Sequence, residues 1–384
     1  MRRRRWLAYG CAHCLVVASG RGHAQSSFIA PPRFERPDLA SDEGGLWAIM
    51  DREEQRLRRS PFRIREQGLQ DYLQDVACKL GGAHCADLRV YPLRSPYFNA
   101  SMAPNGMMQV WSGLLLRLEN EAQLAAVIAH EVGHFMQRHS VERLRDVKAR
   151  AAFGTFLGMF GLVGAVASLA TLASAFGFTR DQERQADLVG LDLMEQAGYD
   201  PREAAKVWSN LSAELAANPE VDPQRNSPML ATHPDALERS RTLAERAQGK
   251  TGRTGEAEFL ARVAPLRFEL LSDELKRNRF DETLVLMERL LQRQPGHGEL
   301  LHFRGETWRQ RAQPGDADLA MADLGAAAAS GQAPALTHRS LGHLHRLAER
   351  HEEARRSFQR YLELAPAAPD AELLRHYLTE GKTS

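Results

Sequence analysis

The sequence predicts an α+β fold that is mainly α-helical and divided into two domains. Its 384 residues exceed what one hydrophobic core usually supports. Residues 249–255 contain three glycines and no periodic apolar pattern, which is typical of a linker. Helical patterns mix with a few strand-like segments before this stretch, and only helical patterns follow it. We therefore expect a first domain with a small sheet over residues 25–248, a linker over residues 249–257 and a helical domain over residues 258–384.

The charge balance limits the kinds of partner. The chain has 50 Lys and Arg against 49 Asp and Glu, so its formal net charge is +1. Proteins built mainly to coat nucleic acid are usually strongly basic, so we expect no nucleic-acid partner. The 26% charged and 43% hydrophobic residues are ordinary for a soluble globular protein.

The first residues have the pattern of a secretory signal peptide. Residues 2–5 are all arginine, residues 6–19 carry no charge, and Gly-His-Ala at residues 22–24 fits the small-x-small cleavage pattern. A short membrane anchor is the alternative, but the apolar run is below the ~20 residues that a spanning helix needs. We expect residues 1–24 to be removed on export, leaving Gln25 as the first mature residue.

Two cysteines remain after this cleavage. Cys78 and Cys85 are seven residues apart. In an oxidising compartment such a close pair is typical of one local disulfide, and two free buried thiols are the alternative.

One predicted helix carries the residues of a metal site. A strand is expected at residues 107–111, after a turn, and Asn120 then caps a buried helix. On this helix His130, Glu131 and His134 form the H-E-x-x-H motif. Residues four apart lie one turn above each other, so both imidazoles can face one zinc ion. Glu131 is rotated by about 100° and can reach a metal-bound water as general base.

A third ligand is expected from residues 179–187. Glu183 and Asp187 are four apart and share one helical face. Glu183 can complete a catalytic zinc site, and Asp187 can accept the second ring N–H of His130. The alternative is that both are surface acids of a charged helix.

The segment between the two metal-binding helices has no charged residue. Residues 151–178 are 28 residues long, which is enough for a membrane span. A single crossing would put His130 and Glu183 on opposite sides of the bilayer. We therefore expect a helical hairpin or flap beside the site that is buried, re-entrant or in contact with a membrane surface.

The second domain has the pattern of a tetratricopeptide array, a stack of helix–turn–helix units of 34 residues. Small, packing and terminating residues recur at the spacing of this repeat, as in Gly342, Ala354, Phe358, Tyr361 and Pro366. A generic helical bundle is the alternative. Such stacks present a concave groove to peptides or partner proteins.

These segments together resemble the HtpX- and CAAX-protease-like family of zinc metallopeptidases, in particular exported members with a C-terminal tetratricopeptide array. The resemblance rests on residues 99–106, 130–140, 179–187 and 232–234, with Arg239. It implies a zincin-like first domain with one zinc ion per chain. The third ligand then carries onto Glu183, and the acidic residue four positions later onto Asp187.

The resemblance also assigns residues around the zinc. It places His233 near the metal, to stabilise the tetrahedral oxyanion or to ligate zinc in a closed state. Arg239 would orient substrate or anchor its loop by an ion pair. His139 lies five residues past His134 on a continuous helix, off the ligand face, and is interpreted as structural. Gln185, where glutamate is common, is expected on another face than Glu183.

Substrate binding is expected at a strand edge. The family binds substrate backbone at an edge strand beside the motif helix, which implies this role for Asn99, Met108 and Val110. A plain core strand is the alternative.

The resemblance further implies a periplasmic endopeptidase that acts on unfolded or misassembled envelope proteins. The repeat domain would dock these substrates or the outer-membrane assembly machinery. A chaperone or assembly scaffold that works mainly through the repeat domain remains the alternative.

Overall fold

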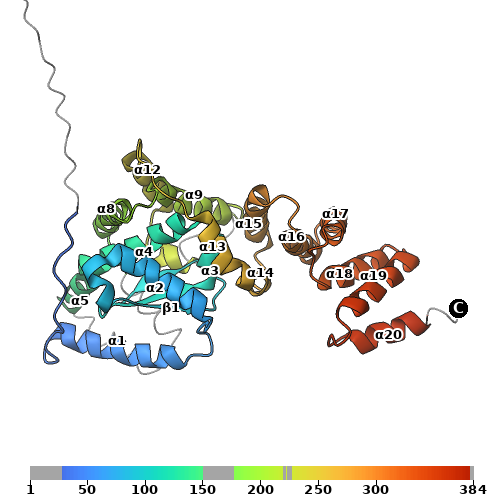
Figure 1. The fold of residues 1–384 in the computed structure, drawn as a ribbon, viewed down its shortest axis with the longest axis horizontal. Helices are drawn as coiled ribbons and strands as arrows, with labels where there is room; N and C mark the ends of the chain where they lie inside the picture. Colours follow the sequence, from blue (N-terminus) through green and yellow to red (C-terminus); the bar gives the residue numbers. More distant parts are fainter. Residues whose placement is uncertain (1–27, 150–176, 219–221, 223–226, 381–384) are drawn as a thin grey trace, which may run out of the picture.

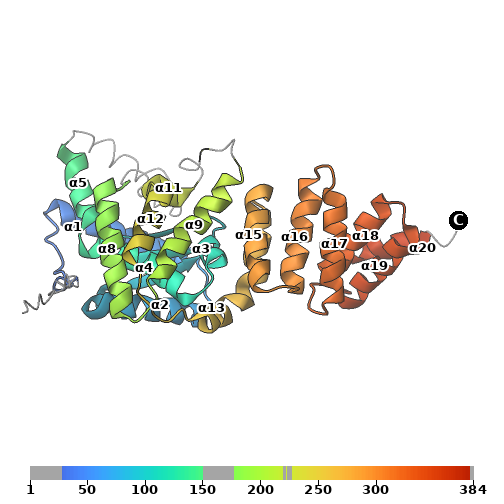
Figure 2. The same ribbon diagram turned by 90° about the horizontal axis from the view of Figure 1, so that it is seen from above.

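The computed structural model describes residues 28–149, 177–218, 222 and 227–380. The predicted signal peptide (residues 1–24) and nearly all of the apolar segment at residues 151–178 lie outside the described residues. Figures 1 and 2 show a broad body from which a row of helices extends to the C-terminus. No helix in the described part of the chain combines the length and apolar character needed to cross a bilayer.

The body is mainly helical, as the sequence predicts. Its helices are α1 (Asp42–Arg59), α2 (Gln67–Gly81), α3 (Ser112–Arg117), α4 (Glu121–Met136), α5 (His139–Ala149), α8 (Arg180–Gln196), α9 (Arg202–Ala216), α11 (Pro228–Thr232), α12 (Ala236–Arg246), α13 (Glu256–Val263) and α14 (Arg267–Leu275). Short 3₁₀ helices η1 (Gly82–Asp87) and η2 (Ala264–Leu266) adjoin α2 and α13.

A three-stranded sheet lies among these helices. Strand β3 (Met107–Trp111) is central, paired in parallel with β1 (Arg89–Leu93) and antiparallel with β2 (Ala100–Met102). Because side chains alternate along a strand, the sheet has two apolar faces. One face joins the main core with α2 and α4, through Val90, Ala100, Met108 and Val110. The other packs against α1 in a smaller core that includes Leu46, Met50, Tyr91, Leu93, Met107 and Trp111.

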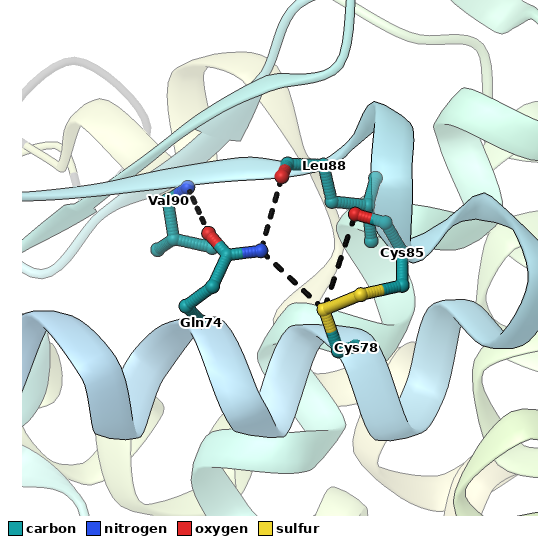
Figure 3. Close-up of a disulfide and its surroundings, with 5 residues drawn as sticks. All are labelled: Gln74, Cys78, Cys85, Leu88 and Val90. Carbon is teal, nitrogen blue, oxygen red and sulfur yellow. Dashed lines mark hydrogen bonds between the residues drawn. A yellow bond between two sulfur atoms is a disulfide. The ribbon is translucent and has the colours of Figure 1, made fainter.

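Helix α2 is tied to the start of β1. Cys78 near the end of α2 forms a disulfide with Cys85 in η1 (Figure 3). One turn earlier, the Gln74 side chain donates to the carbonyl of Leu88 (3.0 Å) and accepts from the N–H of Val90 (3.1 Å). The disulfide and the amide together fix the chain path from α2 into the sheet.

Helices α4 and α8 pack closely through glycines. A Cβ on Gly133 would lie 2.9 Å from the carbonyl oxygen of Ala186, and one on Gly190 would lie 3.2 Å from the amide nitrogen of His130. A glycine inside a helix costs about 1 kcal/mol relative to alanine. Here it permits the backbone contact that brings the motif helix against the helix of the predicted third ligand.

The stretch predicted as a linker is docked onto the body. Arg253 forms a parallel bridge with Tyr199. The carbonyl of Thr254 accepts from the N–H of Ala122 at 2.9 Å, and so satisfies a free donor in the first turn of α4. The segment predicted as a linker, residues 249–257, is therefore packed against the body, because a glycine-rich composition also permits close docking.

The row of helices beyond the body runs to the end of the described chain. Its members are α15 (Phe280–Arg293), α16 (Gly298–Arg311), α17 (Asp316–Ala329), α18 (Leu336–Leu347), α19 (His351–Leu364) and α20 (Ala371–Glu380). Neighbouring helices are joined by short connections and lie side by side (Figure 2). A Cβ on Gly342 would lie 2.4 Å from the ring of Phe358, so α18 and α19 touch where glycine stands.

A buried group of ion pairs joins α3 and α9 to α14 and α15. Arg117 lies 2.7 Å from Glu214 and 2.8 Å from Glu274, and Arg289 lies 2.6 Å from Glu214. Arg117, Glu214 and Glu274 are at most 4% exposed. Helices α14 and α15 are thus held against α3 and α9 through charges that are largely buried.

Candidate active site

Four buried side chains from three parts of the chain meet at one point. His130 and His134 come from α4, Glu183 from α8, and His233 follows α11; one potential ligand atom of each lies within 4.8 Å of the others. The Nε2 atoms of His130 and His134 are 3.1 Å apart, and His233 Nδ1 is 2.9 Å from Glu183. Each of the four is at most 3% exposed. The structure therefore brings the three predicted ligands together and adds His233 to them.

The two motif histidines are held in the neutral form. Burial, followed by the positive charge of Arg239, lowers the pKa of His130 to about 4. Burial also lowers the pKa of His134 well below its usual value. A neutral imidazole keeps a lone pair for a metal ion, so burial prepares both rings for ligation.

Glu183 is held as a carboxylate. Burial alone would raise its pKa, but His233, His134 and Arg239 lower it strongly. Its position is set by the start of α8, where Thr179 and Gln182 form a capping box. One of its oxygens, Oε2, lies 3.1 Å from Nη1 of Arg239 and 3.5 Å from Nε2 of His130. The carboxylate thus stands between the Arg239 cation and the two motif imidazoles, where it can also reach a metal ion.

Asp187 and Arg239 stand behind His130. Asp187 lies 2.9 Å from His130 Nδ1, where it can accept the ring N–H and leave Nε2 free to ligate. Arg239 donates two hydrogen bonds to Asp187, of 2.6 and 2.8 Å. Its guanidinium lies 3.6 Å from the ring centre of Trp208, a residue that sequence reasoning missed. Arg239 is 4% exposed, which favours the anchoring role over direct orientation of substrate.

Glu131 lies beside the four-residue cluster. Burial raises its pKa to about 7, and its Oε1 is buried with no hydrogen-bond partner among the described residues. Oε1 is 3.6 Å from His233 Nε2. Both side chains line one cavity, so Glu131 and His233 face the same space next to the candidate metal site.

His139 is in direct contact with the cluster, which corrects its exclusion from the ligand side. Helix α4 ends at Met136, and Arg138 adopts a left-handed conformation (φ 58°) that turns the chain back. His139 Nδ1 then lies 2.8 Å from His134 Nδ1, and its Nε2 lies 3.1 Å from Gln185 Oε1. Residues 135–140 contain no glycine or proline that would signal the end of the helix. A prediction from helical spacing therefore directs the His139 side chain away from His134, whereas the turn at Arg138 brings the two rings together.

The structure corrects two predicted substrate-binding residues. Met108 and Val110 lie on the central strand β3, are fully buried and belong to the main core. Both edges of β3 are paired, so it cannot take a substrate strand. Asn99 precedes β2, and its carbonyl accepts from the N–H of Trp111 at 3.1 Å. Among the described residues β2 pairs only with β3, so the free edge nearest the site belongs to β2.

The donor set fits zinc. Two imidazoles and one carboxylate are typical of a catalytic zinc site, and His233 is a further nitrogen donor within reach. The convergence of four buried ligand atoms within 4.8 Å of one another is the observation that most favours a bound cation.

Comparison with known proteins agrees with this geometry. The sequence model of peptidase family M48 matches residues 63–247. The mitochondrial metalloendopeptidase OMA1 of Arabidopsis thaliana is 33% identical over 181 residues, which are 44% of this chain and 36% of that protein. The beta-barrel assembly-enhancing protease of Escherichia coli K12 is 24% identical over 338 residues, which are 74% of this chain and 68% of that protein.

A putative beta-barrel assembly-enhancing protease of Vibrio cholerae is 28% identical over 240 residues, 56% of this chain and 48% of that protein. The chain thus spans less than half the length of the Arabidopsis and Vibrio relatives. The family match confirms the resemblance predicted from the sequence. Residues 63–247 of the chain therefore match peptidase family M48.

Proposed function

We propose that this chain is a zinc-dependent endopeptidase. The observation that carries the proposal is the buried cluster of His130, His134 and Glu183, with Glu131 beside it. When bound, zinc supplies Lewis acidity that activates a water and polarises the scissile carbonyl. One ion per chain fits the one such cluster among the described residues.

Glu131 is the general base and then the general acid. Its carboxylate takes a proton from the attacking water and later passes one to the leaving amine nitrogen. Its Oε1 accepts no hydrogen bond from the described residues and lies 3.6 Å from His233 Nε2. His233 has two roles open to it: a hydrogen bond to the developing oxyanion, or a fourth bond to the metal.

Substrate backbone pairs with the free edge of β2. The N–H of Ala103 bonds to Met107 (2.8 Å) and the carbonyl of Asn99 to Trp111 (3.1 Å), so these residues face β3. Hydrogen-bonding directions alternate along a strand, so Ala100 and Met102 direct their backbone groups outward. The N–H of Met102 already bonds to the Glu131 carboxylate, which places this edge beside the catalytic base.

We further propose that the enzyme works in the periplasm on unfolded or misassembled envelope proteins. The signal-peptide pattern at residues 1–24 supports export. Two relatives carry the name beta-barrel assembly-enhancing protease, which supports a role in the envelope. The helices from α15 to α20 would form the tetratricopeptide array that docks substrates or the outer-membrane assembly machinery.

The test compares zinc content and casein cleavage for the mature wild type, Glu131→Gln and Glu183→Ala. We expect one zinc per chain in the wild type and in Glu131→Gln, loss of zinc in Glu183→Ala, and cleavage by the wild type alone. Full zinc in Glu183→Ala would contradict the ligand assignment and point to His233 as the third ligand.

A chaperone or assembly scaffold is the second candidate, because a long row of helices lies outside the peptidase domain. A Glu131→Gln variant separates the two. Loss of cleavage together with loss of the cellular phenotype favours the peptidase, and a retained phenotype favours the scaffold.

A further inference from the structure

The cavity beside Glu131 has mainly apolar walls. Its lining residues come from α1, β2, the turn after it, β3 and the chain before α8: Leu46, Met50, Met102, Ala103, Pro104, Met107 and Phe178. Its polar lining residues include Ser101, Gln109 and the catalytic pair Glu131 and His233. The cavity therefore offers no carboxylate or cation other than the groups already assigned to the reaction.

Strand geometry relates this cavity to substrate. Met107 and Ala103 face α1, in the smaller core. Ser101 is two residues before Ala103 and pairs with Gln109, so its side chain faces the same way. A substrate strand on the free edge of β2 places residues opposite those of β2, and opposite residues direct their side chains to the same face. The substrate residue opposite Ser101 thus sends its side chain to the α1 side, where the cavity lies.

We propose that this cavity is a specificity subsite for an uncharged, apolar side chain. The inference rests on the proposed peptidase function and names the chemistry of its substrate. Methionine walls adapt to more than one side-chain shape, which suits an enzyme that meets many unfolded chains. A charged side chain would lose its hydration there without gaining a partner.

Helix α1 supplies a wall of this subsite and lies before the part of the chain that matches the family. It spans Asp42–Arg59, whereas the family match begins at residue 63. It is fixed over the sheet by Glu54, which contacts Arg89 (2.7 Å) and the hydroxyl of Tyr91 (2.7 Å). Met50 is 3% exposed and reaches the cavity from this helix. Met50 is therefore a position outside the family match at which a charge can be placed next to the cavity.

The experiment profiles cleavage of a randomised synthetic peptide library by the zinc-loaded full chain, with products sequenced by mass spectrometry. We expect leucine, methionine and similar residues to be enriched at one position near the scissile bond, and acidic residues to be depleted there. Met50→Lys should raise acceptance of Asp and Glu at that position by about tenfold relative to the wild type. Met50→Leu should keep the wild-type profile.

Gln55→Lys is the matched control, because it adds the same charge to an exposed position of α1. It should leave the profile unchanged. A gain of acidic substrates cannot arise from misfolding, and a thermal unfolding curve of each variant checks the fold. If the wild type cleaves without apolar preference, or Met50→Lys keeps the wild-type profile, the subsite inference is overturned and the peptidase proposal stands. If the zinc-loaded wild type cleaves nothing, both fail.

Discussion

Single side chains decide how well the site can hold its metal. Asp187 and Arg239 contact the ring of His130 from behind. His139, which is itself bonded to Gln185, contacts the ring of His134. Partners of this kind set the tautomer and the direction of a ligating imidazole. The site is therefore built from ligands and their hydrogen-bond partners together.

Replacing Asp187 by asparagine should weaken zinc binding without unfolding the protein. The amide keeps the size of the side chain but lacks the charge that holds the His130 N–H and pairs with Arg239. We expect a loss of about 10- to 100-fold in zinc affinity, measured by competition with a chelator. Asp181→Asn on the same helix is the control, because its side chain is 84% exposed. Equal affinities for wild type and Asp187→Asn would contradict this role.

Sequence patterns predicted the residues whose positions depend on local spacing. The four-residue interval of His130 and His134 places them on one face of any helix, whatever surrounds it. Trp208 and His139 could not be found in this way. Trp208 comes from α9, and His139 reaches His134 only because the chain turns at Arg138. Both contacts depend on backbone geometry that local composition does not specify.

At the scale of elements, helix α1 is held by one buried carboxylate. Burial would raise the pKa of Glu54, but hydrogen bonds from Arg89, Tyr91 and Arg58 lower it from 4.5 to about 2. A group whose pKa is lowered on folding stabilises the protein above its unfolded pKa. That contribution is lost as pH falls from about 4.5 towards about 2.

We therefore expect Glu54→Gln to lower the melting temperature at neutral pH, with a difference from wild type that shrinks as pH falls through this range. Thermal unfolding at a series of pH values measures it. Glu245→Gln, at an exposed position of α12, should show no such trend. A difference that stays constant down to the lowest pH would show that the Glu54 charge is not the cause.

Strand order is another property of elements that pattern alone left open. Residues 107–111 were predicted as a strand, and they form β3. Their place at the centre of the sheet follows from parallel pairing with β1 and antiparallel pairing with β2, both of which precede β3 in the chain. An alternating or apolar run of residues does not distinguish a central strand from an edge strand. The prediction that substrate binds at Met108 and Val110 therefore placed the substrate edge on β3, both of whose edges are paired.

At the scale of the whole molecule, a cluster of charges connects the body to the first helix of the row. Arg117 contacts Glu214 of α9 and Glu274 of α14 within the body, and Arg289 of α15 contacts Glu214. A buried charge left without its partner is costly. The contact between Arg289 and Glu214 thus helps to fix where the row of helices begins relative to the body.

We expect Arg117→Met to destabilise the protein by about 3–5 kcal/mol, because two carboxylates lose their shared cation. Urea unfolding of the full chain measures the change. The control is Arg360→Met, which removes an exposed pair with Glu363 and should cost at most about 1 kcal/mol. Similar losses for the two variants would show that the cluster does not carry the connection.

The sequence by itself determined what short-range rules specify: the helical character, the motif on α4, the close cysteine pair and the family. Only the tertiary structure decided which strand is free, that the glycine-rich stretch caps α4, and that α1 borders the cavity beside Glu131. The reason is physical. Spacing along one helix or strand fixes the directions of the side chains within that element. Contacts between elements depend on packing and on chain reversals, and these can differ between sequences that share the same pattern.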